Sequence, residues 1–195
     1  MLAPLIIIVE ELFLPFCLLI LIGILLNGIR NIYGSDGSDH MNIVIYVSAV
    51  IYGLSAESIL SQNLSLWFIS IQYILSLFIA GIYKLSSEIW RSGKALPGIM
   101  SMKHYGNHKI YDTLKSHKNI SILLSWYIIL IQCIFWTIFF VPLNMIFIFI
   151  ALGFIFHISI AITMGLNNFL FSFLACYPVL WICIQNSQNF ISNLF

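Results

Sequence analysis

The chain has 195 residues, of which 61% are hydrophobic and 8% are charged, and its net charge is +1 at pH 7. Soluble domains contain about 25% charged and about 45–50% apolar residues, so this composition excludes an ordinary soluble protein. A chain this apolar is also not expected to be disordered. Its net charge is close to zero, which argues against binding to nucleic acid. We therefore predict a multi-pass protein of the cell membrane whose first partner is the lipid bilayer.

Six apolar segments follow one another along the chain, at 4–26, 41–60, 66–85, 122–141, 143–162 and 168–184. Each is close to the ~20 residues that a membrane-spanning helix needs. Runs such as IILIQCIFWTIFFV do not alternate apolar and polar residues, which argues against a transmembrane barrel. We expect an all-α transmembrane bundle of about six helices, formed as a single domain over residues 1–195.

Most of the charge lies in a polar stretch at 86–121, between the third and fourth segments. Its basic residues are Arg91, Lys94, Lys103, Lys109, Lys115 and Lys118. The loop at 28–40 carries Arg30, whereas the turns expected at 61–65 and at Pro142 carry no Lys or Arg. Alternation of six segments puts both basic loops on one face, which the positive-inside rule makes cytoplasmic, with both termini outside.

Lys84 is an ionisable residue near the end of an apolar segment. Such residues are costly in a membrane and raise a functional hypothesis by default. Gln72, Ser76 and Ala80 precede Lys84 at intervals of four and form a small, polar stripe on one helix face, which points Lys84 into the bundle. The alternative is that the side chain snorkels to the nearby cytoplasmic interface.

His157 is the one residue of the Asp, Glu, Lys, Arg and His types between residues 119 and 195. It shares a face with Ala161, Gly165 and Asn168, which are again small or polar. One interpretation is a neutral imidazole that packs against a neighbouring helix. The other is a proton donor or acceptor that faces an internal site.

The other ionisable residues and the cysteines give weaker indications of function. Glu57 is expected to be solvated at a segment end, and Glu10 and Glu11 to mark a split or shallow first segment. On local grounds His40 is interpreted as a surface loop residue. His104, His108 and His117, which lie among lysines, are interpreted as loop residues rather than metal ligands. The cysteines are expected to be small apolar side chains: Cys17, Cys133, Cys176 and Cys183.

The stretch FIAGIYKLSSEIWRSGKAL, at 78–96, resembles a segment of the vitamin K-dependent gamma-carboxylases and of the wider horizontally transferred transmembrane (HTTM) domain superfamily. The stretch at 38–40, Ser-Asp-His before an apolar helix, and FHISIAITMGLNNFLFSFLACYP, at 156–178, resemble the same family in the same order. Together the three stretches cover about 37–178. Bacterial members of the superfamily include proteins like the B component that helps to produce a sporulation-delaying toxin.

The resemblance implies Lys84 as a candidate catalytic base, with His40 and His157 as candidate catalytic residues of the same pocket. It alone suggests a quinone as cofactor, and a secreted peptide or a co-expressed membrane protein as partner. The chain departs from the carboxylases at Tyr83, where they carry a second lysine, and it has no counterpart of their large soluble domain.

Three functions stay open at this point. The first is an HTTM-type membrane protein that assists maturation, export or protection around a secreted peptide or toxin. The second is a small quinone-dependent enzyme, of the carboxylase or epoxidase kind, with Lys84 as base. The third is a noncatalytic membrane subunit whose small-residue stripes are packing faces. Whether the protein is an enzyme is left undecided, and a transporter is a weaker alternative because nothing resembles a coupling-ion site.

Overall fold

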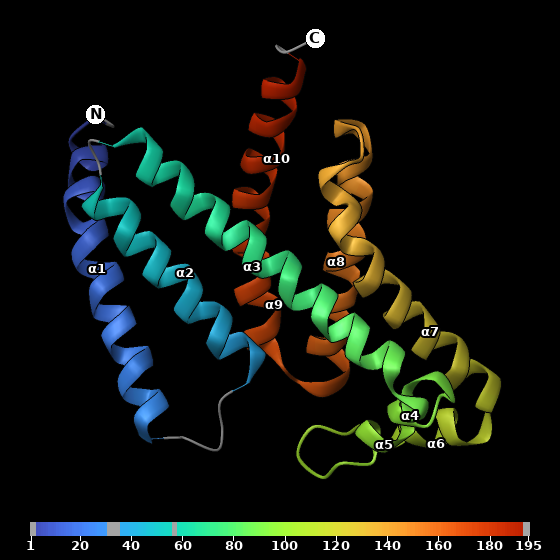
Figure 1. Ribbon diagram of the computed structural model, residues 1–195. Coiled ribbons are helices and arrows are strands. Elements are labelled where there is room, and N and C mark those ends of the chain that lie inside the picture. Colours follow the sequence, from blue (N-terminus) through green and yellow to red (C-terminus); the bar gives the residue numbers. More distant parts are fainter. Residues whose placement is uncertain (1–2, 31–35, 56–57, 193–195) are drawn as a thin grey trace. The chain divides into compact units, whose positions relative to one another are not determined.

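The computed structural model describes residues 3–30, 36–55 and 58–192 (Figure 1). Over these residues the chain forms helices and connecting turns, without strands, which confirms the prediction of an all-α protein. The helices group into two compact units. Residues 74–174 form the second unit, and the residues on either side of this range form the first.

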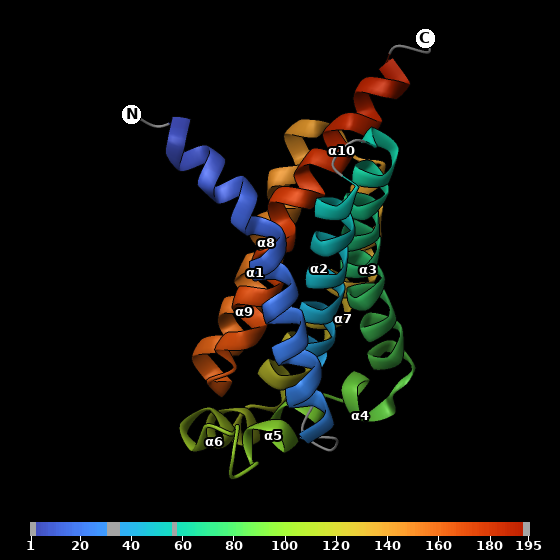
Figure 2. The ribbon, with the colours of Figure 1, turned by 90° about the vertical axis from the view of Figure 1, so that its left-hand side faces the viewer.

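The first unit begins with a helical hairpin. Helix α1 (Ala3–Arg30) continues through Pro15, and α2 (Gly37–Leu54) runs antiparallel to it, as both views show (Figures 1 and 2). Asp36 caps α2 by accepting hydrogen bonds from the backbone N–H groups of Ser38 and Asp39, and the Asp39 side chain accepts one from the Asp36 N–H. This reciprocal capping box explains why α2 begins before the apolar segment predicted from residue 41.

Helix α3 (Ile59–Ser86) starts seven residues before the predicted segment. The turn predicted at 61–65 is wrong, because these residues lie inside the helix. Ser65 Oγ donates a hydrogen bond to the Ser61 carbonyl oxygen at 2.9 Å, so the serine hydroxyl is satisfied within the helix. Serine is therefore tolerated inside a helix when it bonds back by one turn.

The core of the first unit lies between the first part of α3 and α10 (Cys176–Ser192). The rings of Tyr73 and Tyr177 meet edge to face, with centroids 5.7 Å apart. Leu180 and Ile184 are fully buried one and two turns further along α10. Because Tyr73 is itself fully buried, this contact lies in the interior of the unit.

The second unit contains the rest of α3 and the helices that follow it. These are α4 (Glu88–Arg91), α5 (Ala95–Met100), α6 (His108–Ser116), α7 (Lys118–Ile134), the 3₁₀-helix η1 (Phe135–Phe139), α8 (Leu143–Met164) and α9 (Asn167–Leu174). Gly165 ends α8 in the left-handed conformation, with φ at 71°, and its N–H donates to the Ala161 carbonyl. Glycine suits this position because it has no Cβ to strain the left-handed backbone.

The polar stretch at 86–121 is folded rather than a loop. Helices α5 and α6 share a small apolar core, formed by the buried side chains of Leu96, Met100 and Leu114. Ser121 Oγ, at the start of α7, donates to the Gly93 carbonyl at 2.5 Å, and both residues are buried. We refer to α4, α5 and α6 with their connections, residues 87–117, as the platform.

Five helical segments of the described chain are long and apolar enough to cross a membrane. They are Glu11–Arg30, Ile59–Ser86, Lys118–Phe139, Leu143–Met164 and Asn167–Gln188. The second of the six predicted segments becomes α2 and is not among the five, because its first two turns include Ser38, Asp39, His40 and Asn42. The last span contains the short break between α9 and α10.

Candidate functional site

Lys84 lies in the last turn of α3 and is half-buried in the second unit. Its Nζ donates to the Ala80 carbonyl oxygen at 3.4 Å and lies 5.1 Å from the centroid of the Trp90 ring. Among the residues that the structure describes, no carboxylate pairs with this amine. A carbonyl and an aromatic face therefore surround the charge in place of an acidic partner.

One turn before Lys84, α3 meets α7 at very close range. A Cβ built on Gly81 would lie 2.9 Å from both the backbone nitrogen and the Sγ of Cys133. Such an approach is open only to a residue without a side chain, so Gly81 sets how closely the two helices pack. The lysine thus follows directly on a fixed crossing point of α3 and α7.

The buried face of α3 lies beside the predicted polar stripe rather than along it. Gln72, Ser76 and Ala80 are all half-buried, whereas Leu77 and Gly81 are buried. Lys84 follows Ala80 by four residues and Gly81 by three, so it stands at the edge of the buried face.

Two buried polar groups on α7 were missed by the sequence analysis. Ser125 Oγ and Gln132 Oε1 are buried, and neither has a hydrogen-bond partner among the described residues. The signal that could have revealed them is the spacing of Ser121, Ser125 and Gln132, which places three polar residues on one face of an apolar helix. Gln132 is adjacent in sequence to Cys133 and therefore close to the α3–α7 crossing.

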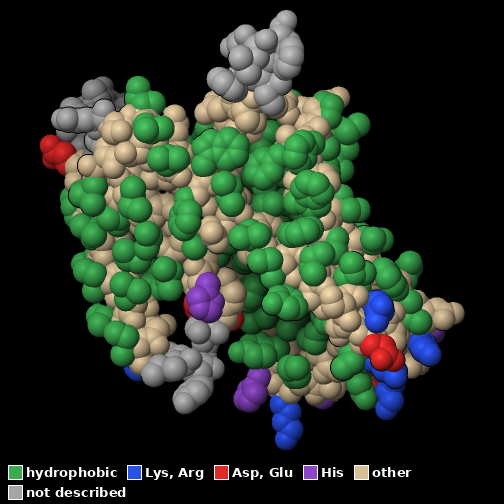
Figure 3. Space-filling view, in the orientation of Figure 1, with side chains coloured by type: hydrophobic (Ala, Val, Ile, Leu, Met, Phe, Trp, Pro, Cys, Tyr) green, Lys and Arg blue, Asp and Glu red, His purple; other side chains and the backbone are tan. Residues whose placement is uncertain are grey.

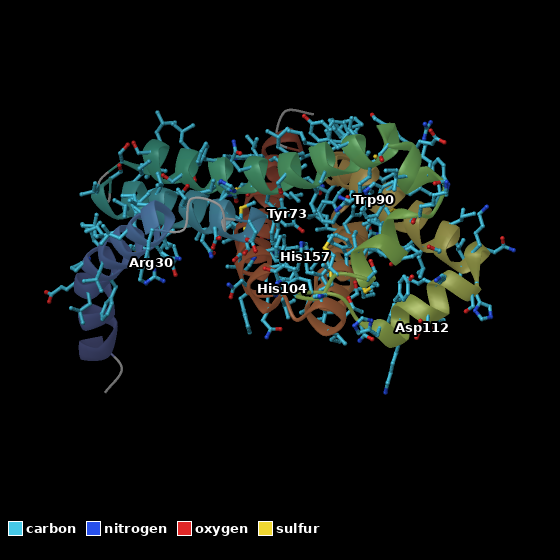
Figure 4. All side chains as sticks on the ribbon, turned by 90° about the horizontal axis from the view of Figure 1, so that it is seen from below. Arg30, Tyr73, Trp90, His104, Asp112 and His157 are labelled. Carbon is cyan, nitrogen blue, oxygen red and sulfur yellow. The ribbon has the colours of Figure 1, made fainter. Side chains whose placement is uncertain are left out.

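His157 is buried in the middle of α8, with 2% of its surface exposed. Its Nδ1 lies 2.7 Å from the Gly153 carbonyl oxygen, and because a carbonyl only accepts, Nδ1 carries the proton in this hydrogen bond. The imidazole stacks on Phe173 of α9, with centroids 4.5 Å apart, and meets Phe156 edge to face. Figure 4 shows His157 within the second unit. Of the stripe predicted with it, Ala161 is buried, whereas Gly165 and Asn168 are exposed beyond the end of the helix.

His40 belongs to the first unit, whereas Lys84 and His157 belong to the second. It is exposed in the first turn of α2, where its N–H donates to the Asp36 carbonyl at 3.3 Å. The described contacts of Lys84 do not include His157.

The other ionisable residues named from the sequence add no further cluster. Glu57 and the side chain of Glu10 lie outside the described residues, and Glu11 is exposed. Within the described part of the chain, no three His, Cys, Asp or Glu side chains are placed to hold a metal ion. The four cysteines form no disulfide, and three of them are buried.

Each unit also contains an apolar pocket. In the second unit, a pocket of about 160 Å³ is lined by residues of α7, η1 and α8 that include Tyr127, Phe135 and Phe149. In the first unit, a pocket of about 240 Å³ is lined in part by Phe13, Ser48 and Ser65. Neither lining includes Lys84, His157 or His40.

The five apolar spans and the all-helical fold define the class of the protein: it is a multi-pass integral membrane protein. No family model, curated protein or solved structure matches the chain. The resemblance to the HTTM superfamily therefore depends on the three short stretches of sequence alone.

Proposed function

We propose that the chain is an integral membrane protein of the HTTM type that assists the maturation, export or protection of a secreted peptide or toxin. In this proposal Lys84 is the residue on which the activity depends. The stretch at 78–96 supports the family, and the contacts of Lys84 support the site. One observation carries the proposal. The Lys84 amine is half-buried at the end of a span, and it has no carboxylate partner among the described residues.

Two kinds of chemistry are open to such an amine. In its charged form it binds an acidic group of a peptide, because a cation near the membrane interior gains more from an anionic partner than a cation in water does. In its neutral form it accepts a proton, as the base of the related carboxylases is expected to do. The first role needs only the positive charge, whereas the second needs an amine that can lose its proton.

The test is complementation in a host strain from which the gene has been deleted. Peptides secreted into the medium, and self-toxicity of the strain, are compared between the deletion strain and strains that carry the wild type or a variant. We expect Lys84→Ala to lose the activity that the wild type restores. Lys94→Ala is the matched control, since Lys94 is an exposed lysine of the same unit, and it should retain that activity.

Lys84→Arg separates the two kinds of chemistry, because arginine keeps the charge and does not lose its proton. An active Lys84→Arg beside an inactive Lys84→Ala indicates anion binding. Two inactive variants indicate a base. A fully active Lys84→Ala protein, inserted at wild-type level, would contradict the proposal and leave the noncatalytic subunit. An unchanged set of secreted peptides and unchanged toxicity in the deletion strain would contradict the role in peptide maturation, export or protection.

A further inference from the structure

The platform carries most of the positive charge of the chain. Together with Lys118 it contains six of the eight Lys and Arg residues, against only two acidic residues, Glu88 and Asp112. All six basic side chains are exposed, and none of them pairs with a carboxylate among the described residues. Figure 3 shows basic side chains gathered at the end of the second unit formed by the platform, below a surface of apolar side chains.

The connectivity holds this charge close to the membrane surface. The platform follows α3, a span that ends at Ser86, and precedes α7, a span that begins at Lys118. It is also tied to α7 by the hydrogen bond from Ser121 to Gly93. Its charges are therefore held next to the membrane surface, where attraction to charged headgroups remains effective over about 10 Å at physiological salt.

The fold of the platform turns its charges outward. The apolar side of α6 is already covered, because Leu114 is buried and Ile110 and Tyr111 pack against the same core. Lys109 and Lys115 are exposed on the same helix. The platform also exposes Ile89, Met102 and Tyr105, with 60%, 50% and 49% of their surfaces accessible, in the same stretch of chain as the basic residues. Apolar and aromatic side chains mixed with lysines are typical of surfaces at the boundary of headgroups and acyl chains.

We propose that the platform binds the headgroups of anionic phospholipids in the monolayer that it faces. The lipid phosphates supply the negative partners that these basic side chains lack among the described residues. This inference is independent of the proposed function of Lys84, because the basic side chains that it uses are not contacts of Lys84. The proposal also differs from the positive-inside rule, which concerns only the orientation of the chain. It states that the inserted protein prefers anionic phospholipids to neutral ones.

The experiment uses the full-length protein in nanodiscs that contain equal amounts of phosphatidylglycerol and phosphatidylcholine. Native mass spectrometry counts the lipids of each kind that stay bound after the disc is removed. The first variant is Lys103→Gln/Lys109→Gln/Lys115→Gln, and the second is Glu88→Gln/Asp112→Asn, which changes the charge in the opposite direction. All five side chains are exposed, so both variants are expected to fold.

We expect the wild type to retain phosphatidylglycerol over phosphatidylcholine. The preference should fall in the lysine variant, by up to about fivefold for each charge removed, and rise in the acidic-residue variant. Equal retention of the two lipids by the wild type, or the same preference in all three proteins, would overturn the proposal and leave orientation as the role of the charge. Displacement of phosphatidylglycerol by millimolar inorganic phosphate would also overturn it, by indicating a site for the free ion.

Discussion

The amine of Lys84 lies over the ring of Trp90, 5.1 Å from its centroid. Lys84 belongs to the last turn of a span and Trp90 to the platform, so the contact links the two. A cation over an aromatic face is stabilised by about 0.5–1 kcal/mol when exposed and about 2 kcal/mol when water is excluded.

We expect Trp90→Leu to free the Lys84 amine. Leucine keeps an apolar side chain against the platform core but has no ring face, so the amine should react several times faster with a water-soluble acylating reagent. Trp90→Phe should lie between the two, because phenylalanine binds cations less well than tryptophan does. Site-resolved mass spectrometry measures the labelling of each lysine.

Labelling of Lys94 is the internal control in the same experiment. It should not change, since Lys94 is already exposed. A parallel rise at Lys84 and Lys94 would show that the platform has unfolded instead. Equal labelling of Lys84 in the wild type and in Trp90→Leu would contradict a stabilising role for the ring.

Gly81→Ala tests the close packing of α3 and α7. The new methyl group would lie 2.9 Å from the backbone nitrogen of Cys133, which cannot move aside as the end of a flexible side chain can. We expect a destabilisation of about 1–3 kcal/mol, measured as a lower melting temperature in detergent. The control is Gly98→Ala, because nothing lies within 4 Å of a Cβ at that position. A melting temperature equal to that of the control would contradict the close approach.

How much of this packing was predictable depends on the kind of signal. Apolar length predicted five of the six segments as spans, because a helix in lipid must satisfy its own backbone groups over a fixed thickness. The crossing at Gly81 was not predictable, since a glycine in an apolar run is compatible with many helix partners. The turn predicted at 61–65 failed because Ser61 and Ser65 were counted as polar residues, although Ser65 hydrogen-bonds inside the helix.

The contacts within the candidate site were also not predictable from the sequence. Lys84, His157 and His40 were selected because they are ionisable and because the three stretches resemble one family. Periodicity can assign residues to one helix face, but it does not say which residues of different helices meet. Trp90 was therefore not expected as the partner of Lys84, and neither were the buried Ser125 and Gln132.

Two substitutions of His157 separate packing from chemistry. His157→Phe keeps an aromatic ring against Phe173 and should change the free energy of unfolding by less than about 1.5 kcal/mol. His157→Ala removes the ring and should cost about 2–4 kcal/mol by leaving a cavity. The measurement is unfolding in detergent, followed by the complementation assay. If His157 takes part in proton transfer, His157→Phe should be folded and inactive; a folded and active variant would assign the residue to packing.

The orientation of the chain depends on α2. This helix has 18 residues and is about 27 Å long at 1.5 Å per residue, close to the thickness of the hydrocarbon core. If α2 crosses, the end of α1 at Arg30 and the platform lie on the same side of the membrane. If it does not cross, they lie on opposite sides. The positive-inside rule favours the first arrangement, because it places both basic loops in the cytoplasm.

Three single cysteine variants decide between these arrangements: Asn27→Cys at the end of α1, Met102→Cys on the platform and Asn144→Cys at the start of α8. All three positions are exposed, whereas three of the native cysteines are buried. We expect a membrane-impermeant thiol reagent to label Asn144→Cys in intact cells, and the other two only after permeabilisation. Labelling of Asn27→Cys and Met102→Cys from opposite sides would show that α2 stays on one side of the bilayer. Labelling of both from outside would reverse the orientation and place Lys84 near the side that faces exported peptides.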